Sequence, residues 1–161
     1  MSISQSDRQK VTRLINSPKM KLWMLRELPM AYFLGIRVKY CNEQAAETTM
    51  PFWWLSQNPF KSVYFAAQCA AAELSTGVLV ISSTANDKRI SVLLAGIESE
   101  YTKKATTRVT FKCEDGEKIR QAVDEAMRTG EGKTVTAVST GYDEKGDVVS
   151  VSKLTWSFKR R

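Results

Sequence analysis

Glu73 is the residue of this sequence that a purely structural role explains least well. It is the only acidic residue in a run from Val63 to Ile81 that is otherwise almost entirely apolar. A helix that is apolar on every side belongs inside a protein, where an ionised carboxylate without a partner is expensive to bury. Glu73 must therefore reach a polar cavity, pair with a cation, or have its pKa raised by desolvation. If Glu73 has no catalytic role, it is instead a glutamate at a subunit edge with access to water.

The sequence contains no histidine, which narrows the chemistry that any site could perform. Ser-His-Asp and Cys-His machinery and most catalytic zinc sites are excluded together, and we expect no metal site. Acid–base work must come from carboxylates, lysine, tyrosine or the backbone. Three cysteines, Cys41, Cys69 and Cys113, lack CxxC spacing. We interpret them as free thiols in the core of a cytoplasmic protein, because a reducing cytosol keeps such thiols unpaired.

Composition and charge limit the class of protein and its partners. At 161 residues, with 43% hydrophobic and 25% charged residues, the chain is expected to fold around a single core. The net charge of +7 could attract phosphates, but the basic residues are scattered among acids and no nucleic-acid-binding motif is present. We therefore expect no nucleic-acid partner. The most apolar window, residues 65–81, is interrupted by polar residues and too short to span a bilayer.

Helical patterns position the candidate carboxylate. Ser6 with Gln9 resembles a capping box and predicts a first short helix, and Pro18 can open a second, so residues 1–28 form a predicted N-terminal helical extension. The apolar helix over 63–81 follows later in the chain, and Gly77 and the stretch 82–87 are expected to help end it.

Extended patterns surround the apolar helix on both sides in the sequence. We predict strands at 36–42, 45–50, 90–101, 108–113, 133–142 and 148–158. The first two and the last two read as hairpins, because short polar turns separate them. Apolar residues at helical spacing between Gly116 and Gly130 predict an amphipathic surface helix. The fold class is therefore α+β, with antiparallel strands around one long buried helix.

The run from Asn58 to Glu73 resembles the loop-and-helix signature of hotdog-fold acyl-CoA thioesterases. That signature reads roughly asparagine, then His-Gly-Gly, then an acidic residue on the helix, and Glu73 falls on the acidic position. Similarity extends over residues 28 to 158 and is closest to an uncharacterised branch related to phenylacetyl-CoA-type acyl-CoA thioesterases. It implies a hotdog domain over residues 29–161, an antiparallel sheet wrapped around one helix, preceded by the N-terminal helices.

The resemblance implies an acyl-CoA thioesterase and assigns roles to five residues. Glu73 falls on the catalytic acid and would serve as base or nucleophile. Tyr64, Phe65 and Ala66 fall on the His-Gly-Gly, so the backbone N–H groups of Phe65 and Ala66 would bind the developing oxyanion. The Tyr64 hydroxyl replaces the histidine as a donor. Asn58, on the family's loop asparagine, would orient the water or the thioester.

The resemblance also implies partners. Coenzyme A would enter as part of the substrate, an acyl-CoA or another acyl thioester, and no separate cofactor is expected. Lys103, Lys104 and Arg108 would bind its phosphates, although a solvated strand end accounts for them slightly better. Hotdog proteins pair subunits with sites at the seam, so we expect a homodimer, with a dimer of dimers as a larger assembly. The alternative function is a non-catalytic acyl- or CoA-binding hotdog protein, because Phe65 and Ala66 add side chains where the family has glycines.

Overall fold

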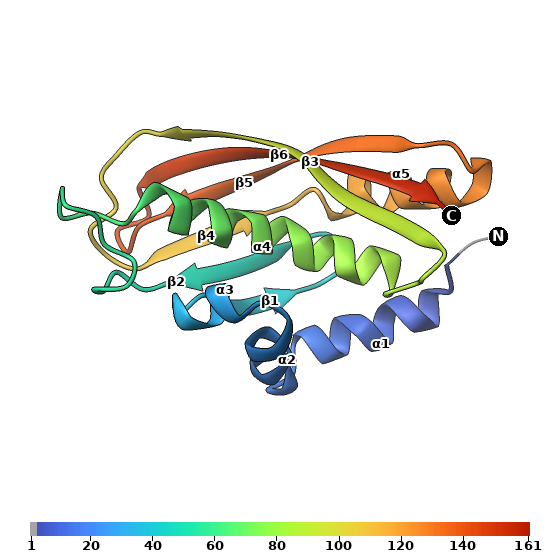
Figure 1. The fold of residues 1–161 in the computed structure, drawn as a ribbon, viewed down its shortest axis with the longest axis horizontal. Helices are drawn as coiled ribbons and strands as arrows, with labels where there is room; N and C mark the ends of the chain where they lie inside the picture. The colour runs from blue at the N-terminus through green and yellow to red at the C-terminus, as the bar shows by residue number, and fades with distance from the viewer. Residues whose placement is uncertain (1–2) are drawn as a thin grey trace.

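The computed structural model describes residues 3–161, so residues 1 and 2 of the predicted extension lie outside the described residues (Figure 1). Its first elements are the helices α1 (Gln5–Ile15), α2 (Lys19–Glu27) and α3 (Pro29–Phe33), the strands β1 (Arg37–Cys41) and β2 (Ala46–Met50), and the central helix α4 (Phe65–Thr84). The strands β3 (Ile90–Tyr101) and β4 (Val109–Cys113), helix α5 (Gly116–Thr129), and the strands β5 (Lys133–Tyr142) and β6 (Val148–Arg160) follow. The elements make an α+β fold, as predicted.

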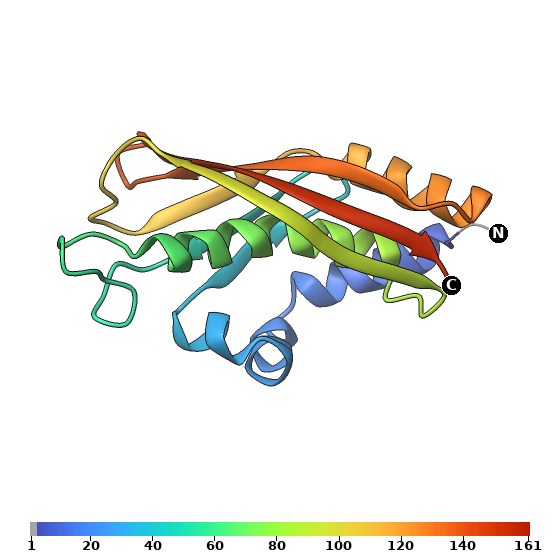
Figure 2. The ribbon, with the colours of Figure 1, turned by 45° about the horizontal axis from the view of Figure 1, so that its top comes forward.

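The six strands form one antiparallel sheet in the order β1-β2-β4-β5-β6-β3. The predicted hairpins, β1–β2 and β5–β6, are both confirmed. Figures 1 and 2 show the sheet curving over α4, with the N-terminal helices on the other side of that helix. Strand β3 follows α4 in the chain and pairs only with β6 among the described residues, so β3 forms one edge of the sheet.

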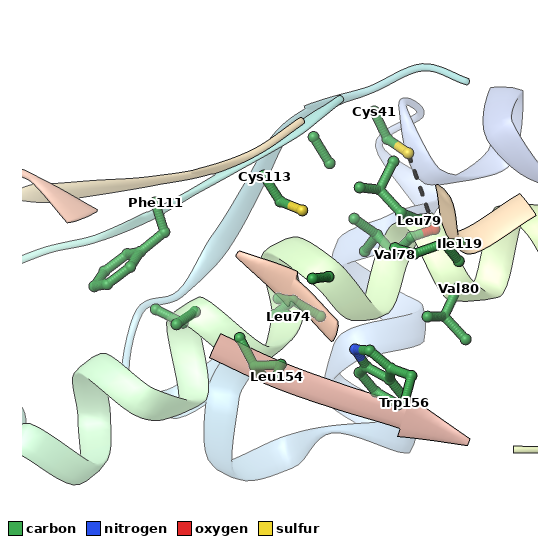
Figure 3. Packing of buried hydrophobic residues seen from close by; sticks show 14 of the residues in the cluster. Cys41, Leu74, Val78, Leu79, Val80, Phe111, Cys113, Ile119, Leu154 and Trp156 are labelled. Carbon is green, nitrogen blue, oxygen red and sulfur yellow. Dashed lines mark hydrogen bonds between the residues drawn. The ribbon is translucent and has the colours of Figure 1, made fainter. Parts of the chain in front are cut away.

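Small side chains let α4 pack closely inside this sheet. Ala71, Leu74 and Val78 are fully or almost fully buried, and Figure 3 shows Leu74 and Val78 among the packed core residues. Thr48 on β2 donates a hydrogen bond of 2.8 Å to the carbonyl of Ala71, which ties helix to sheet. The buried apolar residues form one cluster, so the predicted single core is confirmed.

The central helix begins two residues later and ends three residues later than its sequence pattern predicted. It continues through Gly77 and ends at Thr84, where Ala85 adopts a left-handed conformation, so the expected end within residues 82–87 is confirmed. The expectation that Gly77 helps to end the helix was wrong, because burial on several faces outweighs the weak helix propensity of one glycine. By length and composition α4 could also cross a membrane, but 67% of its most apolar window is buried inside this fold.

The N-terminal helices pack on the same core. Ile15 and Met24 are 4% and 0% exposed. The predicted capping box was wrong in detail: α1 begins at Gln5, and the hydroxyl of Ser6 pairs with that of Ser4 instead of capping the helix. The short helix α3 was not predicted.

Two of the three cysteines fill the core as expected. Burial raises the pKa of Cys41 to about 12 and that of Cys113 to about 11. The expectation was wrong for Cys69, which is only half-buried on α4 and lies 3.1 Å from the hydroxyl of Tyr101 on β3. Among residues 3–161, no group of three or more metal-ligating side chains is brought together.

Candidate functional site

Glu73 lies near the middle of α4 on a strip of the helix that the sheet leaves partly open. Phe65, Cys69 and Glu73 follow one another at intervals of four residues, so they share one side of the helix. All three are exposed or half-buried, whereas Leu74 and Ala72 beside Glu73 are buried. The carboxylate therefore projects from a buried helix toward the open side.

The Glu73 carboxylate has no hydrogen bond or ion pair with any of residues 3–161. Burial alone raises its pKa above the ordinary value of 4.5. Gly77, one turn further along α4, provides space for it, because a Cβ atom there would lie 3.2 Å from Glu73 Oε1. A half-buried carboxylate that is held in no ion pair is a candidate general base.

A pocket of about 340 Å³, here called the Glu73 pocket, lies beside this carboxylate. It is bounded by α2, α4, β3 and β6. Its apolar lining comes from Trp23, Leu28, Leu74, Val80, Ile81, Ile90, Val92 and Trp156. Sequence reasoning missed the two tryptophans, because a tryptophan in a helix or in an alternating strand reads as core.

The start of α4 supplies unused backbone donors. The N-cap residue Tyr64 is extended and makes no side-chain cap bond within the described chain. The first N–H groups bonded to the carbonyl of Tyr64 are those of Ala67 and Gln68. The N–H groups of Phe65 and Ala66 thus have no acceptor within residues 3–161, as the first turn of an uncapped helix leaves them.

The structure places Asn58 inside the loop that leads into α4. Its Oδ1 accepts hydrogen bonds from the backbone N–H groups of Phe60 (3.0 Å) and Ser62 (3.2 Å) and from the Ser62 hydroxyl (3.2 Å). Its Nδ2 donates to the carbonyl of Val63 at 3.4 Å. The amide of Asn58 is therefore engaged in shaping the loop that delivers the helix start.

A second pocket of about 370 Å³, here called the helix-start pocket, brings several predicted residues together. Its lining includes Asn58, Phe65, Gln68, Tyr101, Lys103 and Lys104. Sequence reasoning missed Gln68, a polar residue inside an apolar run. Gln68 is 5% exposed, and its Oε1 atom has no hydrogen-bond partner within residues 3–161.

The three predicted cations are placed differently. Lys103 is held between Asp143 and Asp147 at 2.7 and 2.6 Å, so two carboxylates already neutralise it. Lys104 is exposed, lines the helix-start pocket and forms no ion pair with the described residues. Arg108 is exposed and lines neither pocket.

Within one chain the carboxylate and the backbone donors belong to different pockets. Eight residues separate Phe65 from Glu73, which is about 12 Å along a helix that rises 1.5 Å per residue. A water-activating group and its oxyanion donors must both lie about 3 Å from one reacting carbonyl. One chain does not bring them that close.

This architecture, one antiparallel sheet wrapped around a long central helix, is the hotdog fold. The chain belongs to the family described as "Domain of unknown function (DUF4442)", whose model matches residues 19–158. A comparison with curated proteins found no match.

Solved structures share the fold at low sequence identity. A Pseudomonas aeruginosa protein of unknown function, described as a probable thioesterase, is 20% identical over 100% of this chain and 99% of its own, with a TM-score of 0.74. A Chlorobaculum tepidum protein of unknown function is 14% identical, covering 89% and 93%, with a TM-score of 0.75. A Haemophilus influenzae thioesterase is 16% identical, covering 88% of each chain, with a TM-score of 0.60.

Proposed function

We propose that this protein is an acyl thioester hydrolase in which Glu73 activates water. The observation that carries the proposal is the half-buried Glu73 carboxylate, unpaired within residues 3–161 and placed beside an apolar pocket. A carboxylate of raised pKa in a largely apolar cleft matches what a general base for hydrolysis near neutral pH requires. The solved relatives described as thioesterases support the same class of reaction.

The working form in this proposal is a homodimer with sites between the subunits. The separation of Glu73 from the N–H groups of Phe65 and Ala66 argues for it, because a second copy can bring its own helix start to the first copy's carboxylate. Strand β3 supports the same assembly. Its outer edge is unpaired within the described chain, and Leu93 and Ile97 on it are 63% and 45% exposed.

In the proposed reaction, Glu73 takes a proton from a water molecule as the water oxygen bonds to the thioester carbonyl carbon. The carbonyl π electrons move to oxygen, and the resulting oxyanion accepts hydrogen bonds from the N–H groups of Phe65 and Ala66 of the other copy. The intermediate then collapses, the C–S bond breaks, and the thiolate takes the proton from Glu73. The products are a carboxylic acid and a free thiol. In a variant of this scheme Glu73 attacks directly as the nucleophile.

The thiol carrier is proposed to be coenzyme A, and it belongs to the substrate. Lys104 is the cation best placed for a phosphate, because it lines the helix-start pocket and is unpaired among the described residues. Lys103 would have to give up Asp143 and Asp147 first.

A panel of acyl-CoA substrates with detection of the released thiol tests the proposal. We expect turnover by the native protein and a loss of at least about 100-fold in kcat for Glu73→Gln, as for removal of a general base. Glu125→Gln, which alters an exposed carboxylate on α5, is the matched control and should leave kcat unchanged. Hydrolysis that survives Glu73→Gln at the native rate would refute the assignment.

A non-catalytic acyl- or CoA-binding protein is the second candidate. The Phe65 side chain is 54% exposed at the start of α4 and forms edge contacts with the rings of Tyr64 and Tyr101, at centroid distances of 4.8 and 6.4 Å. This aromatic group occupies space where a thioester would approach the backbone. Thermal stabilisation by coenzyme A without turnover of any acyl-CoA would favour this candidate, and turnover above background would exclude it.

A further inference from the structure

The Glu73 pocket has a wall that comes from outside the helix and sheet. Trp23 and Leu28, at α2 and its end, close the space between α4 and the β3–β6 side of the sheet. Trp156 on β6 and Val92 on β3 line the same space. The catalytic proposal uses only Glu73 from this pocket and leaves the rest of its lining without a role.

The lining beside Glu73 offers little for a polar ligand to bind. The indole N–H of Trp156 is already bonded to the Thr76 hydroxyl at 3.0 Å, so the ring presents carbon to the pocket. Trp23 is half-buried and packs against the core. Besides Glu73, the polar residues of the lining are Thr84, the last residue of α4, and Asn86 and Asp87, which come just after the helix. An apolar group that entered beside Glu73 would therefore lose water and meet mainly carbon.

The volume limits the size of such a group. A cavity of about 150 Å³ lined by apolar side chains is enough to hold benzene. The Glu73 pocket, at about 340 Å³, has roughly twice that space. It therefore has room for an apolar group of medium length.

We propose that the Glu73 pocket holds the apolar acyl portion of the thioester and that Trp23, contributed by the N-terminal helices, sets the length of acyl chain accepted. The inference rests on the proposed function, because it places the acyl group next to the residue that activates water. It makes Trp23 a specificity-determining residue that lies far from Glu73 in the sequence. Buried methylenes should then contribute about fourfold each to kcat/KM until the pocket is full.

Two substitutions change the pocket in opposite directions. Trp23→Ala removes an indole from its wall, and Ile81→Trp, at a half-buried position on α4, adds one. Leu22→Ala is the matched control, since Leu22 lies on the same helix but is 70% exposed and does not line the pocket. Each variant is compared with the native protein over acyl-CoA substrates of increasing chain length.

Binding is measured in parallel, with non-hydrolysable S-alkyl-CoA thioethers of the same chain lengths as the probe. In both assays we expect the preferred length to increase in Trp23→Ala, to decrease in Ile81→Trp, and to stay unchanged in Leu22→Ala. For the longest chains that the native protein accepts, Ile81→Trp should lower kcat/KM by at least about tenfold.

The two assays separate the two proposals. One outcome is that the preferred thioether length changes in Trp23→Ala and Ile81→Trp while neither the native protein nor any variant hydrolyses any acyl-CoA. That outcome would support the acyl pocket and overturn the hydrolase. Hydrolysis with an unchanged length profile in both variants would support the hydrolase and overturn the acyl pocket. Thioether affinity independent of chain length in the native protein would also overturn the acyl pocket. Far-ultraviolet circular dichroism and a cooperative thermal unfolding transition of each variant distinguish altered specificity from unfolding.

Discussion

At the scale of the residue, Glu73 is a carboxylate whose burial disfavours its charged form. Its ionised carboxylate is half-buried without a partner among residues 3–161, and burial raises its pKa above 4.5. A raised pKa in the folded state means that folding favours the protonated form. The contribution of Glu73 to stability is therefore most favourable below pH 4.5 and is lost as the pH rises through the folded-state pKa.

Replacing Glu73 by glutamine should therefore stabilise the protein in a pH-dependent way. We expect Glu73→Gln to raise Tm at pH 7.5 and the increase to shrink toward pH 4, where the native carboxyl is protonated as well. In a domain of this size each kcal/mol corresponds to about 2–4 °C. Calorimetry from pH 4 to 8, with Glu125→Gln as the control, measures the effect. An increase in Tm that is the same at every pH would contradict the assigned environment of Glu73.

Sequence reasoning recognised Glu73 because the chemistry of one residue conflicts with its apolar run. It did not recognise the surroundings. Asp143 and Asp147, which bind Lys103, lie in a turn some 40 residues away in the chain. Trp23 and Trp156 line one pocket only because the tertiary fold brings them together. Such partners lie beyond what local spacing can indicate.

At the scale of the element, β3 is unusual for an edge strand. It runs over 12 residues, pairs only with β6 in the described chain, and exposes Leu93 and Ile97. Long apolar edges are normally covered, because they template pairing with other chains. The homodimer proposed above would cover it.

Charges placed on this edge should weaken self-association. We expect Leu93→Lys with Ile97→Lys to raise the dimer dissociation constant by at least about tenfold, since 1.4 kcal/mol is enough for that change. Thioesterase activity should fall in the same concentration range. Sedimentation velocity on the double variant, with Leu22→Lys on α2 as an exposed apolar control, tests this. A native protein that is monomeric at micromolar concentration would rule out the role given to β3.

Element types followed well from sequence where a periodicity was long and clear. The extended pattern over 108–113 predicted a strand there, and β4 occupies Val109–Cys113 with Val109, Phe111 and Cys113 buried. Boundaries followed less well. The extension of α4 to Thr84 and the existence of α3 depend on packing against other elements. Local helix propensity does not reveal that packing.

At the scale of the whole molecule, one buried side chain joins the N-terminal helices to the core. Arg8 on α1 is 6% exposed. Its Nε donates to the carbonyl of Ser83 near the end of α4 at 2.8 Å, and its guanidinium pairs with Asp124 on α5. This contact fixes the start of the chain against two helices that lie much later in the sequence, and so helps to position α2 and its Trp23.

Loss of the Arg8 guanidinium should lower the stability of the whole fold. We expect Arg8→Met to reduce the free energy of unfolding by about 2 kcal/mol, because hydrogen bonds to a charged group are lost and Asp124 keeps only its pairing with Arg120. Lys10→Met on the same helix removes an exposed pair with Asp7 and should cost less than about 1 kcal/mol. Urea denaturation compares the two, and equal losses would show that Arg8 has no anchoring role.

The whole-molecule architecture was predictable because the hydrophobic pattern and the family signature agree on one helix inside an antiparallel sheet. The homodimer was expected from the family resemblance alone and stays a prediction. The separation of Glu73 from the N–H groups of Phe65 and Ala66 along α4, which also argues for it, depends on the position of the helix start, which the sequence pattern had placed two residues too early.

The space that Gly77 leaves for Glu73 has a consequence for how this family can vary. Glycine inside a helix costs about 1 kcal/mol relative to alanine, and the Cβ of an alanine here would lie 3.2 Å from the carboxylate oxygen. An alanine at 77 would therefore require the Glu73 carboxylate to shift by a few tenths of an ångström. A family member with a small uncharged residue at 73 would not have this contact, so covariation of positions 73 and 77 across the family would show whether the contact constrains both residues.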